Sequence, residues 1–148
     1  MVTSKWKKKN TGKPSEAAFE DRLEKAYGKR VMIYRIVDSA EIVGRTAGRA
    51  WAPATPADYV ITADGRMIFA EVKSTHAKVS FSFTKITTEQ RGYARMQTVA
   101  GGEYIFFIHN LNTDQWYQVP APVIIDHERG SIKWSELEKY KWNQNSLM

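Results

Sequence analysis

Apolar positions recur at helical spacing in three parts of the chain. Between residues 15 and 27 they lie on one face of a helix: Phe19, Leu23, Ala26 and Tyr27. Gly28 then supplies a stop signal. A second helix is predicted from Thr88 to about Ala100, although Gly92 lowers the helix propensity there. The amphipathic pattern of residues 131–142 predicts a helical tail.

The remaining apolar runs predict β-strands. Short β-rich segments occur at residues 31–37, 79–83, 103–110 and 115–120. The run EYIFFIHN is almost continuously apolar, as in a strand that is buried on both faces of a sheet. With helices before, between and after these strands, the order predicts an α/β fold, a mixed central β-sheet flanked by helices.

The segment DYVITADGRMIFAEVKS predicts a β-hairpin. Two apolar runs flank Asp64-Gly65, a dipeptide typical of a two-residue hairpin turn. With these two residues at the turn, paired positions on the strands have numbers that sum to 129. Asp58 is then directly opposite Glu71, and Lys73 lies on the same face as Glu71 because side chains alternate along a strand.

The composition limits the possible classes of protein. The chain has 148 residues, 43% of them hydrophobic, which suffices for the core of one domain. It has no cysteine, which excludes disulfides, thiolate zinc sites and cysteine nucleophiles. It also lacks a run of about 18 uncharged apolar residues and an apolar leader, so we expect a soluble, cytoplasmic protein without membrane contact.

Positive charge is concentrated in two segments. The net charge is +6, and the first thirteen residues contain five lysines and no acid. We expect residues 1–14 to form a flexible basic arm before a single domain at 15–148. A second basic segment, about 38–57, is rich in glycine and proline and predicts a mobile loop. Such segments attract phosphate polymers, but a solvated tail that only aids solubility explains the arm equally well.

The opposition of Asp58 and Glu71 is the candidate chemical centre. Two carboxylates at contact distance repel each other unless a cation neutralises them. Mg²⁺ suits such a pair because it takes oxygen ligands and is often held by only one or two carboxylates. Lys73 beside it could orient a water molecule or counter negative charge on a phosphate. The simpler interpretation is a turn residue next to a surface ion pair, and a turn of odd length would put the two acids on opposite faces.

These residues resemble a known family. PADYVITADGRMIFAEVKST is similar to the PD-(D/E)XK nuclease signature, with Pro56, Asp58, Glu71 and Lys73 in order and Ala57 inserted. Over residues 15–119 the chain resembles the Holliday junction resolvases of the archaeal type and the bacterial RecU type.

The resemblance implies roles for further residues. The helix AAFEDRLEKA is similar to the opening helix of those resolvases, which makes Glu20 a third catalytic and metal-binding candidate. FSFTKITTEQRGYARM is similar to a RecU-type stretch that ends in an active-site glutamine, which corresponds to Gln90; helix capping explains Gln90 equally well. Ser74 and Thr75 could hydrogen-bond phosphate or be ordinary strand hydroxyls. Candidate DNA-binding residues are Lys7, Lys8, Lys9, Arg45, Arg49, Lys85, Arg91 and Arg95.

The resemblance also implies an activity. It is Mg²⁺-dependent resolution of four-way junctions by a homodimer that makes paired symmetric nicks, with Mn²⁺ as a substitute metal. Two alternatives stay open from the sequence. One is a restriction-like or repair nuclease that acts on linear, damaged or flapped DNA. The other is a DNA-binding module without catalysis.

Overall fold

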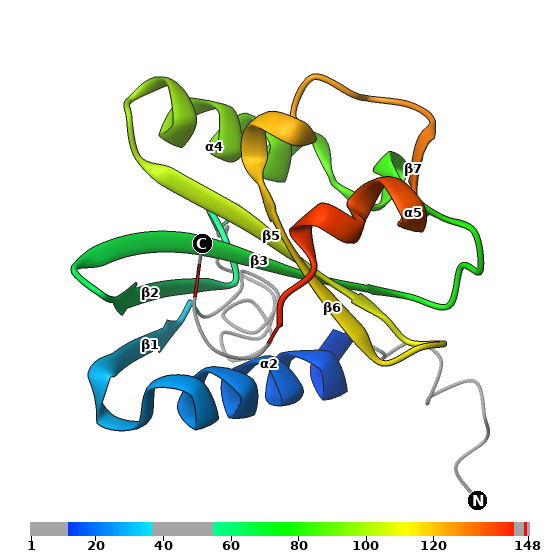
Figure 1. Ribbon diagram of the computed structural model, residues 1–148. Helices are drawn as coiled ribbons and strands as arrows, with labels where there is room; N and C mark the ends of the chain where they lie inside the picture. The colour runs from blue at the N-terminus through cyan, green and yellow to red at the C-terminus, as the bar shows by residue number, and fades with distance from the viewer. Residues whose placement is uncertain (1–11, 37–54, 144–146, 148) are drawn as a thin grey trace, which may run out of the picture.

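The computed structural model describes residues 12–36, 55–143 and 147, and in these residues a five-stranded sheet lies between two helical layers (Figure 1). Helix α2 (Gly12–Tyr27) packs on one face of the sheet, and helix α4 (Thr88–Val99) lies on the other. None of the helices in the described ranges is long and apolar enough to cross a membrane. The expected α/β class, a mixed sheet flanked by helices, is confirmed.

The order of strands in the main sheet is β1-β2-β3-β5-β6. Their bounds are β1 Val31–Arg35, β2 Tyr59–Ala63, β3 Arg66–Thr75, β5 Glu103–Asn110 and β6 Gln115–Pro120. Only the pairing of β3 with β5 is parallel, because the chain crosses over through α4 between these two strands. This crossover places α4 beside the middle of the sheet.

A small second sheet and several short helices complete the described residues. Strands β4 (Ser80–Ser82) and β7 (Ser131–Lys133) pair antiparallel, apart from the main sheet. The short helices are η1 Gly28–Arg30, η2 Phe83–Lys85, η3 Ala121–Val123, α5 Trp134–Leu137 and η4 Glu138–Tyr140.

The hairpin of β2 and β3 has the predicted turn and register. Asp64 and Gly65 have φ angles of 52° and 74°, both positive, as a two-residue type I′ turn requires. Tyr59 pairs with Ala70 and Ala63 with Arg66, so the paired numbers sum to 129 as predicted. The chain just before β2 therefore approaches the middle of β3.

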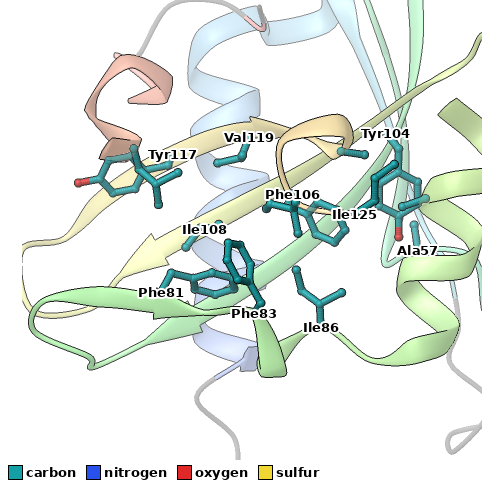
Figure 2. Close-up of a cluster of buried hydrophobic side chains, with 14 of the residues drawn as sticks. Ala57, Phe81, Phe83, Ile86, Tyr104, Phe106, Ile108, Tyr117, Val119 and Ile125 are labelled. Atoms are coloured by element: carbon teal, nitrogen blue, oxygen red, sulfur yellow. The ribbon is translucent and has the colours of Figure 1, made fainter. Parts of the chain in front are cut away.

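The sheet separates two apolar clusters. Phe19 and Leu23 of α2 pack against one face. The other face carries the cluster in Figure 2, which includes Phe81, Phe106 and Ile108. Strand β5 contributes to both clusters, which confirms the prediction that it is buried on both faces.

Four sequence predictions need correction. The first helix begins at Gly12 rather than Ser15; Pro14 is tolerated because the first-turn N–H groups have no partner within the helix. The strand expected at 31–37 ends at Arg35. Residues 79–83 give only a three-residue strand, outside the main sheet. The tail expected to be helical from 131 begins as β7, because Phe81 pairs with Ile132.

Two further predictions concern residues that lie mainly outside the described ranges. Of the expected basic arm, residues 1–11 are outside, and the last three residues of the arm belong to α2. Of the expected loop at about 38–57, residues 38–54 are outside. Both segments stay predictions.

Candidate functional site

The carboxylates of Asp58 and Glu71 meet where β2 begins beside β3. The backbone N–H of Asp58 donates a hydrogen bond to Oε2 of Glu71 at 3.1 Å. The backbone N–H of Val72 donates to Oδ2 of Asp58 at 2.8 Å. Each carboxylate is therefore fixed by the strand that carries the other one.

Burial raises the pKa values of both carboxyls, and repulsion by Asp58 raises that of Glu71 further. The two side chains lie within hydrogen-bonding reach of each other. Burial, followed by the charge of Asp58, raises the pKa of Glu71 to about 8. Burial also raises the pKa of Asp58, and the N–H of Val72 and the charge of Lys73 act in the opposite direction. Without a cation, the pair carries a cost in stability at neutral pH.

Two further side chains contact Glu71. Nζ of Lys73 lies 3.6 Å from Oε1 of Glu71. The side-chain amide of Gln90, in the first turn of α4, donates to the same oxygen at 2.7 Å. Gln90 also forms a capping box with Thr87, whose backbone N–H donates to Oε1 of Gln90 at 3.0 Å. The capping role of Gln90 is therefore confirmed, and its amide nitrogen also contacts Glu71; its active-site role stays a prediction.

Sequence reasoning missed two residues near the pair. The hydroxyl of Tyr104, on β5, donates to the carbonyl of Pro56 at 2.7 Å and so holds the segment that leads to Asp58. Burial raises the pKa of Tyr104, which keeps this hydroxyl a donor. The positive charge of Arg35, at the end of β1, lowers the pKa of Asp58. Nη2 of Arg35 lies 3.7 Å from Oε2 of Glu16. For Tyr104 the sequence signal was an aromatic residue with a hydroxyl group in an otherwise apolar strand. For Arg35 it was a cationic residue at the end of a strand.

Glu20 lies on the other face of the sheet from Glu71. Its Oε2 accepts a hydrogen bond from the hydroxyl of Tyr59 at 3.1 Å. Among the described residues, no group of three or more acidic or histidine side chains gathers as a metal site. The structure therefore brings together Asp58, Glu71, Lys73 and Gln90, and a metal-binding role for Glu20 stays a prediction from the family resemblance.

The hydroxyl and cationic candidates have different surroundings. Thr75, the last residue of β3, is buried, and its hydroxyl accepts from the N–H of Ala77. Ser74 is half-buried and has a partner within the protein. Arg91 is also buried, and it donates to the carbonyls of Phe83, Ile124 and Ile125. The expectation of a DNA contact by Arg91 is wrong, because its guanidinium joins α4 to η2 and η3.

Two of the other cationic candidates lie at the surface. Lys85 is exposed at the end of η2. Arg95 is half-exposed, and its Nη1 lies 3.2 Å from Oδ1 of Asp126. Lys7, Lys8, Lys9, Arg45 and Arg49 lie outside the described residues.

The donor set at the pair fits a divalent cation such as Mg²⁺. Two oxygen ligands from carboxylates and a water-accessible side suit Mg²⁺, which keeps several of its own waters. Asp58 is only half-buried, which leaves such a side. A bound cation would also offset the repulsion that raises the pKa of Glu71. The chemistry of the residues present is therefore that of a hard-metal site with an ammonium group beside it.

Comparison with known proteins gives a structural neighbour. No protein-family model and no curated protein sequence matches the chain. Among solved structures, Hjc, a Holliday junction resolvase from the archaeal hyperthermophile Archaeoglobus fulgidus, matches with a TM-score of 0.58 and 16% sequence identity. The match covers 85% of this chain and 91% of the resolvase. The chain therefore shares its fold with an archaeal Holliday junction resolvase, as the resemblance of residues 15–119 predicted.

Proposed function

We propose that this protein is a Mg²⁺-dependent DNA endonuclease that resolves four-way junctions by paired, symmetric nicks. The observation that carries the proposal is the contact of Asp58 and Glu71 across the hairpin, with Lys73 at 3.6 Å from Glu71. The fold shared with an archaeal junction resolvase supports the choice of substrate. A protein that only bound DNA would gain nothing from two buried acids beside a phosphate backbone.

In this proposal Asp58 and Glu71 hold the metal ion, with Glu20 as a further candidate ligand. When bound, Mg²⁺ or Mn²⁺ would stabilise negative charge on the scissile phosphate and acidify a water molecule. The N–H of Val72 fixes the carboxylate of Asp58, and Gln90 fixes that of Glu71. The protein thus holds both ligands in place before the cation arrives.

Lys73 supplies a positive charge on the same strand. Its ammonium group lies beside Glu71 and is mostly buried, so water screens its charge only weakly. From there it would orient the attacking water or compensate charge on a phosphoryl oxygen. Lys85, Arg95 and the basic segments at 1–14 and 38–57 would hold the DNA backbone.

A panel of DNA substrates tests the proposed function. Purified protein with Mg²⁺ is offered a four-way junction, a flap and a linear duplex of the same sequence, and cleavage rates are compared on denaturing gels. We expect cuts at paired positions of the junction and little cutting of the linear duplex. Equal cutting of linear duplex or preferred cutting of the flap would instead indicate a restriction-like or repair nuclease. Tight junction binding without any cutting would indicate a binding module.

Replacement of Gln90 is expected to separate its two roles. Gln90→Glu keeps an oxygen for the N–H of Thr87 but replaces the amide that donates to Glu71 with a repelling carboxylate. We expect cleavage to fall by about 10–100-fold, the usual effect of removing a group that orients a metal ligand.

The matched control is Thr87→Ala, which removes the hydroxyl cap of α4 but leaves the contact with Glu71. It should lower the free energy of unfolding by about 1 kcal/mol and change cleavage little. Equal loss of cleavage in both variants would assign Gln90 to helix capping alone.

A further inference from the structure

A polar pocket lies at the outer edge of the sheet, where β6, α2 and the segment after η4 meet (Figure 1). Its volume is about 350 Å³. Since a water molecule occupies about 30 Å³ of liquid, the pocket has room for a small polyatomic ligand together with several waters. The lining residues that bear on the nature of this ligand are Arg22, Asp114, Gln115, Trp116, Lys141 and Trp142.

The guanidinium group of Arg22 is held in one position at this pocket. Its Nη2 donates to the backbone carbonyl of Trp142, and its Cζ lies 4.8 Å from the centroid of the Trp142 ring. Trp142 is itself fixed, because it is only 1% exposed and its N–H donates to the carbonyl of Trp116 on β6 at 2.8 Å. The guanidinium therefore loses little conformational freedom when it binds a ligand.

Two buried donors at the pocket have no hydrogen-bond partner among the residues that the structure describes. They are Nε of Arg22 and Nε1 of Trp142, and no other buried side-chain nitrogen or oxygen in the described ranges lacks a partner. Both atoms can only donate, so each of them needs an acceptor. Buried polar atoms without a partner are rare in folded proteins. Because both atoms belong to touching residues of one pocket, they indicate a ligand with acceptor atoms there.

The charges at the pocket favour an anion. Arg22 and Lys141 supply two cations, and Asp114 supplies one acid, whose Oδ1 lies 2.7 Å from Nε2 of His109 on β5. Nζ of Lys141 lies 3.2 Å from Oε1 of Glu138, but an ammonium group has three donors and can bind a second acceptor. Burial lowers the pKa of Arg22, although the charge of Asp114 acts in the opposite direction. The charge of Arg22 is therefore poorly solvated, and an anion would stabilise it.

The donors come from three elements, which restricts the shape of the ligand. Arg22 belongs to α2, Gln115 to β6 and Lys141 to the segment after η4. Oε1 of Gln115 accepts from the hydroxyl of Tyr117 at 3.3 Å, and its NH2 group can donate to a ligand. A carboxylate has its two oxygens in one plane, whereas a phosphate has oxygens at the corners of a tetrahedron. A guanidinium group binds phosphate through two parallel hydrogen bonds, so phosphate fits this set of donors best.

We propose that this pocket is a phosphate-binding site, which takes the phosphate of a free ion or of a DNA backbone. The pocket lies on the α2 side of the sheet, whereas Glu71 contacts Gln90 of α4 on the other side. The site is therefore distinct from the carboxylate pair, and phosphate binding does not depend on the proposed nuclease activity. A DNA phosphate at this site would add a backbone contact away from the proposed metal ion.

Isothermal titration calorimetry with inorganic phosphate tests the site. The full chain is titrated in EDTA, which prevents phosphate binding through a metal ion, and sodium chloride of equal ionic strength is the reference. Arg22→Gln should raise the Kd for phosphate at least about tenfold, because hydrogen bonds to a charged group contribute that much. Lys141→Gln leaves the contact of Arg22 with Trp142 in place and should raise the Kd by about threefold.

Arg30→Gln is the matched control. It makes the same substitution at a side chain that is 71% exposed and lies outside the pocket, so this variant should bind phosphate like the wild type. Circular dichroism checks that each variant is folded, and Lys141→Gln decides the result if Arg22→Gln is unfolded. Equal phosphate affinity in the wild type and in both pocket variants would place the anion elsewhere and refute the proposal.

DNA binding at several salt concentrations distinguishes the two sources of phosphate. A four-way junction and a linear duplex are titrated in EDTA with the wild type and with Arg22→Gln. A DNA phosphate at the pocket predicts that the plot of log affinity against log salt has a slope smaller by about one in the variant. An unchanged slope, together with phosphate binding in calorimetry, assigns the site to free phosphate. A wild type that binds phosphate no better than chloride and a variant with an unchanged slope would together overturn the proposal. Neither measurement involves cleavage, so the phosphate site and the proposed nuclease can fail separately.

Discussion

Asp58→Asn is expected to abolish Mg²⁺-dependent cleavage and to leave junction binding within about twofold of the wild type. Asparagine keeps the size of the side chain and an oxygen that accepts from the N–H of Val72. It removes the negative charge that would hold the cation. A metal ion contributes several kcal/mol to the transition state of phosphodiester cleavage, so its loss should lower the rate by at least about 10³-fold. Single-turnover cleavage and gel-shift titration of a four-way junction measure the two effects separately.

Asp64→Asn is the matched control for this variant. It makes the same chemical change in the same hairpin, but at the exposed turn, where the nearest ion-pair partner is Arg30 at 4.0 Å. Its cleavage rate should equal that of the wild type. Asp58→Asn protein that retained a tenth of the wild-type rate would show that the carboxylate pair does not hold the essential cation.

The hairpin explains why the centre of the site was predictable from the sequence. A two-residue turn with positive φ at both positions allows one register only, and Asp64-Gly65 is a dipeptide that adopts it readily. Once the register is fixed, the opposition of Asp58 and Glu71 follows from counting residues. The position of Lys73 follows from the alternation of side chains.

Features that depend on distant contacts were not predictable in this way. Residues 80–82 and 131–133 are three-residue strands about fifty positions apart, and nothing local favours their pairing. Arg91 and Arg95 have the same helical spacing, yet Arg91 is buried against the carbonyls of η2 and η3 while Arg95 is half-exposed. A charge pattern on a helix does not say which cation is buried.

The exposed apolar side chains of β1 and β3 did leave a signal in the sequence. Strand β1 reads VMIYR, with apolar residues at both alternating sets of positions, although it lies at the edge of the sheet. An edge strand with one face in water normally alternates between apolar and polar residues. Met32 and Tyr34 thus marked a surface that was exposed and apolar, but only the strand order shows that it continues onto β2 and β3.

Glu71→Gln is expected to remove activity and to stabilise the metal-free protein above pH 7. In the folded protein, burial and the charge of Asp58 raise the pKa of Glu71 from 4.5 to about 8. A carboxyl whose folded-state pKa is raised contributes its stability below the unfolded pKa and loses it as the pH rises through the folded pKa. Wild-type protein in EDTA should therefore lose stability between about pH 5 and pH 8, and the variant, which has no charge to bury, should lose less.

The size of the difference follows from the pKa shift. One pKa unit corresponds to about 1.4 kcal/mol, so the shift supports a difference on the order of 3 kcal/mol between the two proteins over this pH range. For a domain of this size that is roughly 5–10 °C in Tm. Thermal unfolding at pH 5 and pH 8 measures it, and groups that titrate in both proteins cancel in the comparison.

Addition of Mg²⁺ supplies the opposing test, because the same charge that destabilises the empty pair is the one that binds the cation. At pH 8, millimolar Mg²⁺ should raise the Tm of the wild type, since a ligand that binds only the folded state stabilises it. The variant, already stable in EDTA, should not respond. Parallel pH profiles of the two proteins in EDTA would contradict the raised pKa of Glu71, and an equal response to Mg²⁺ would place the cation elsewhere. The folded protein is less stable when the carboxylate pair is ionised and empty than when a divalent cation neutralises it, and this difference favours binding of the cation.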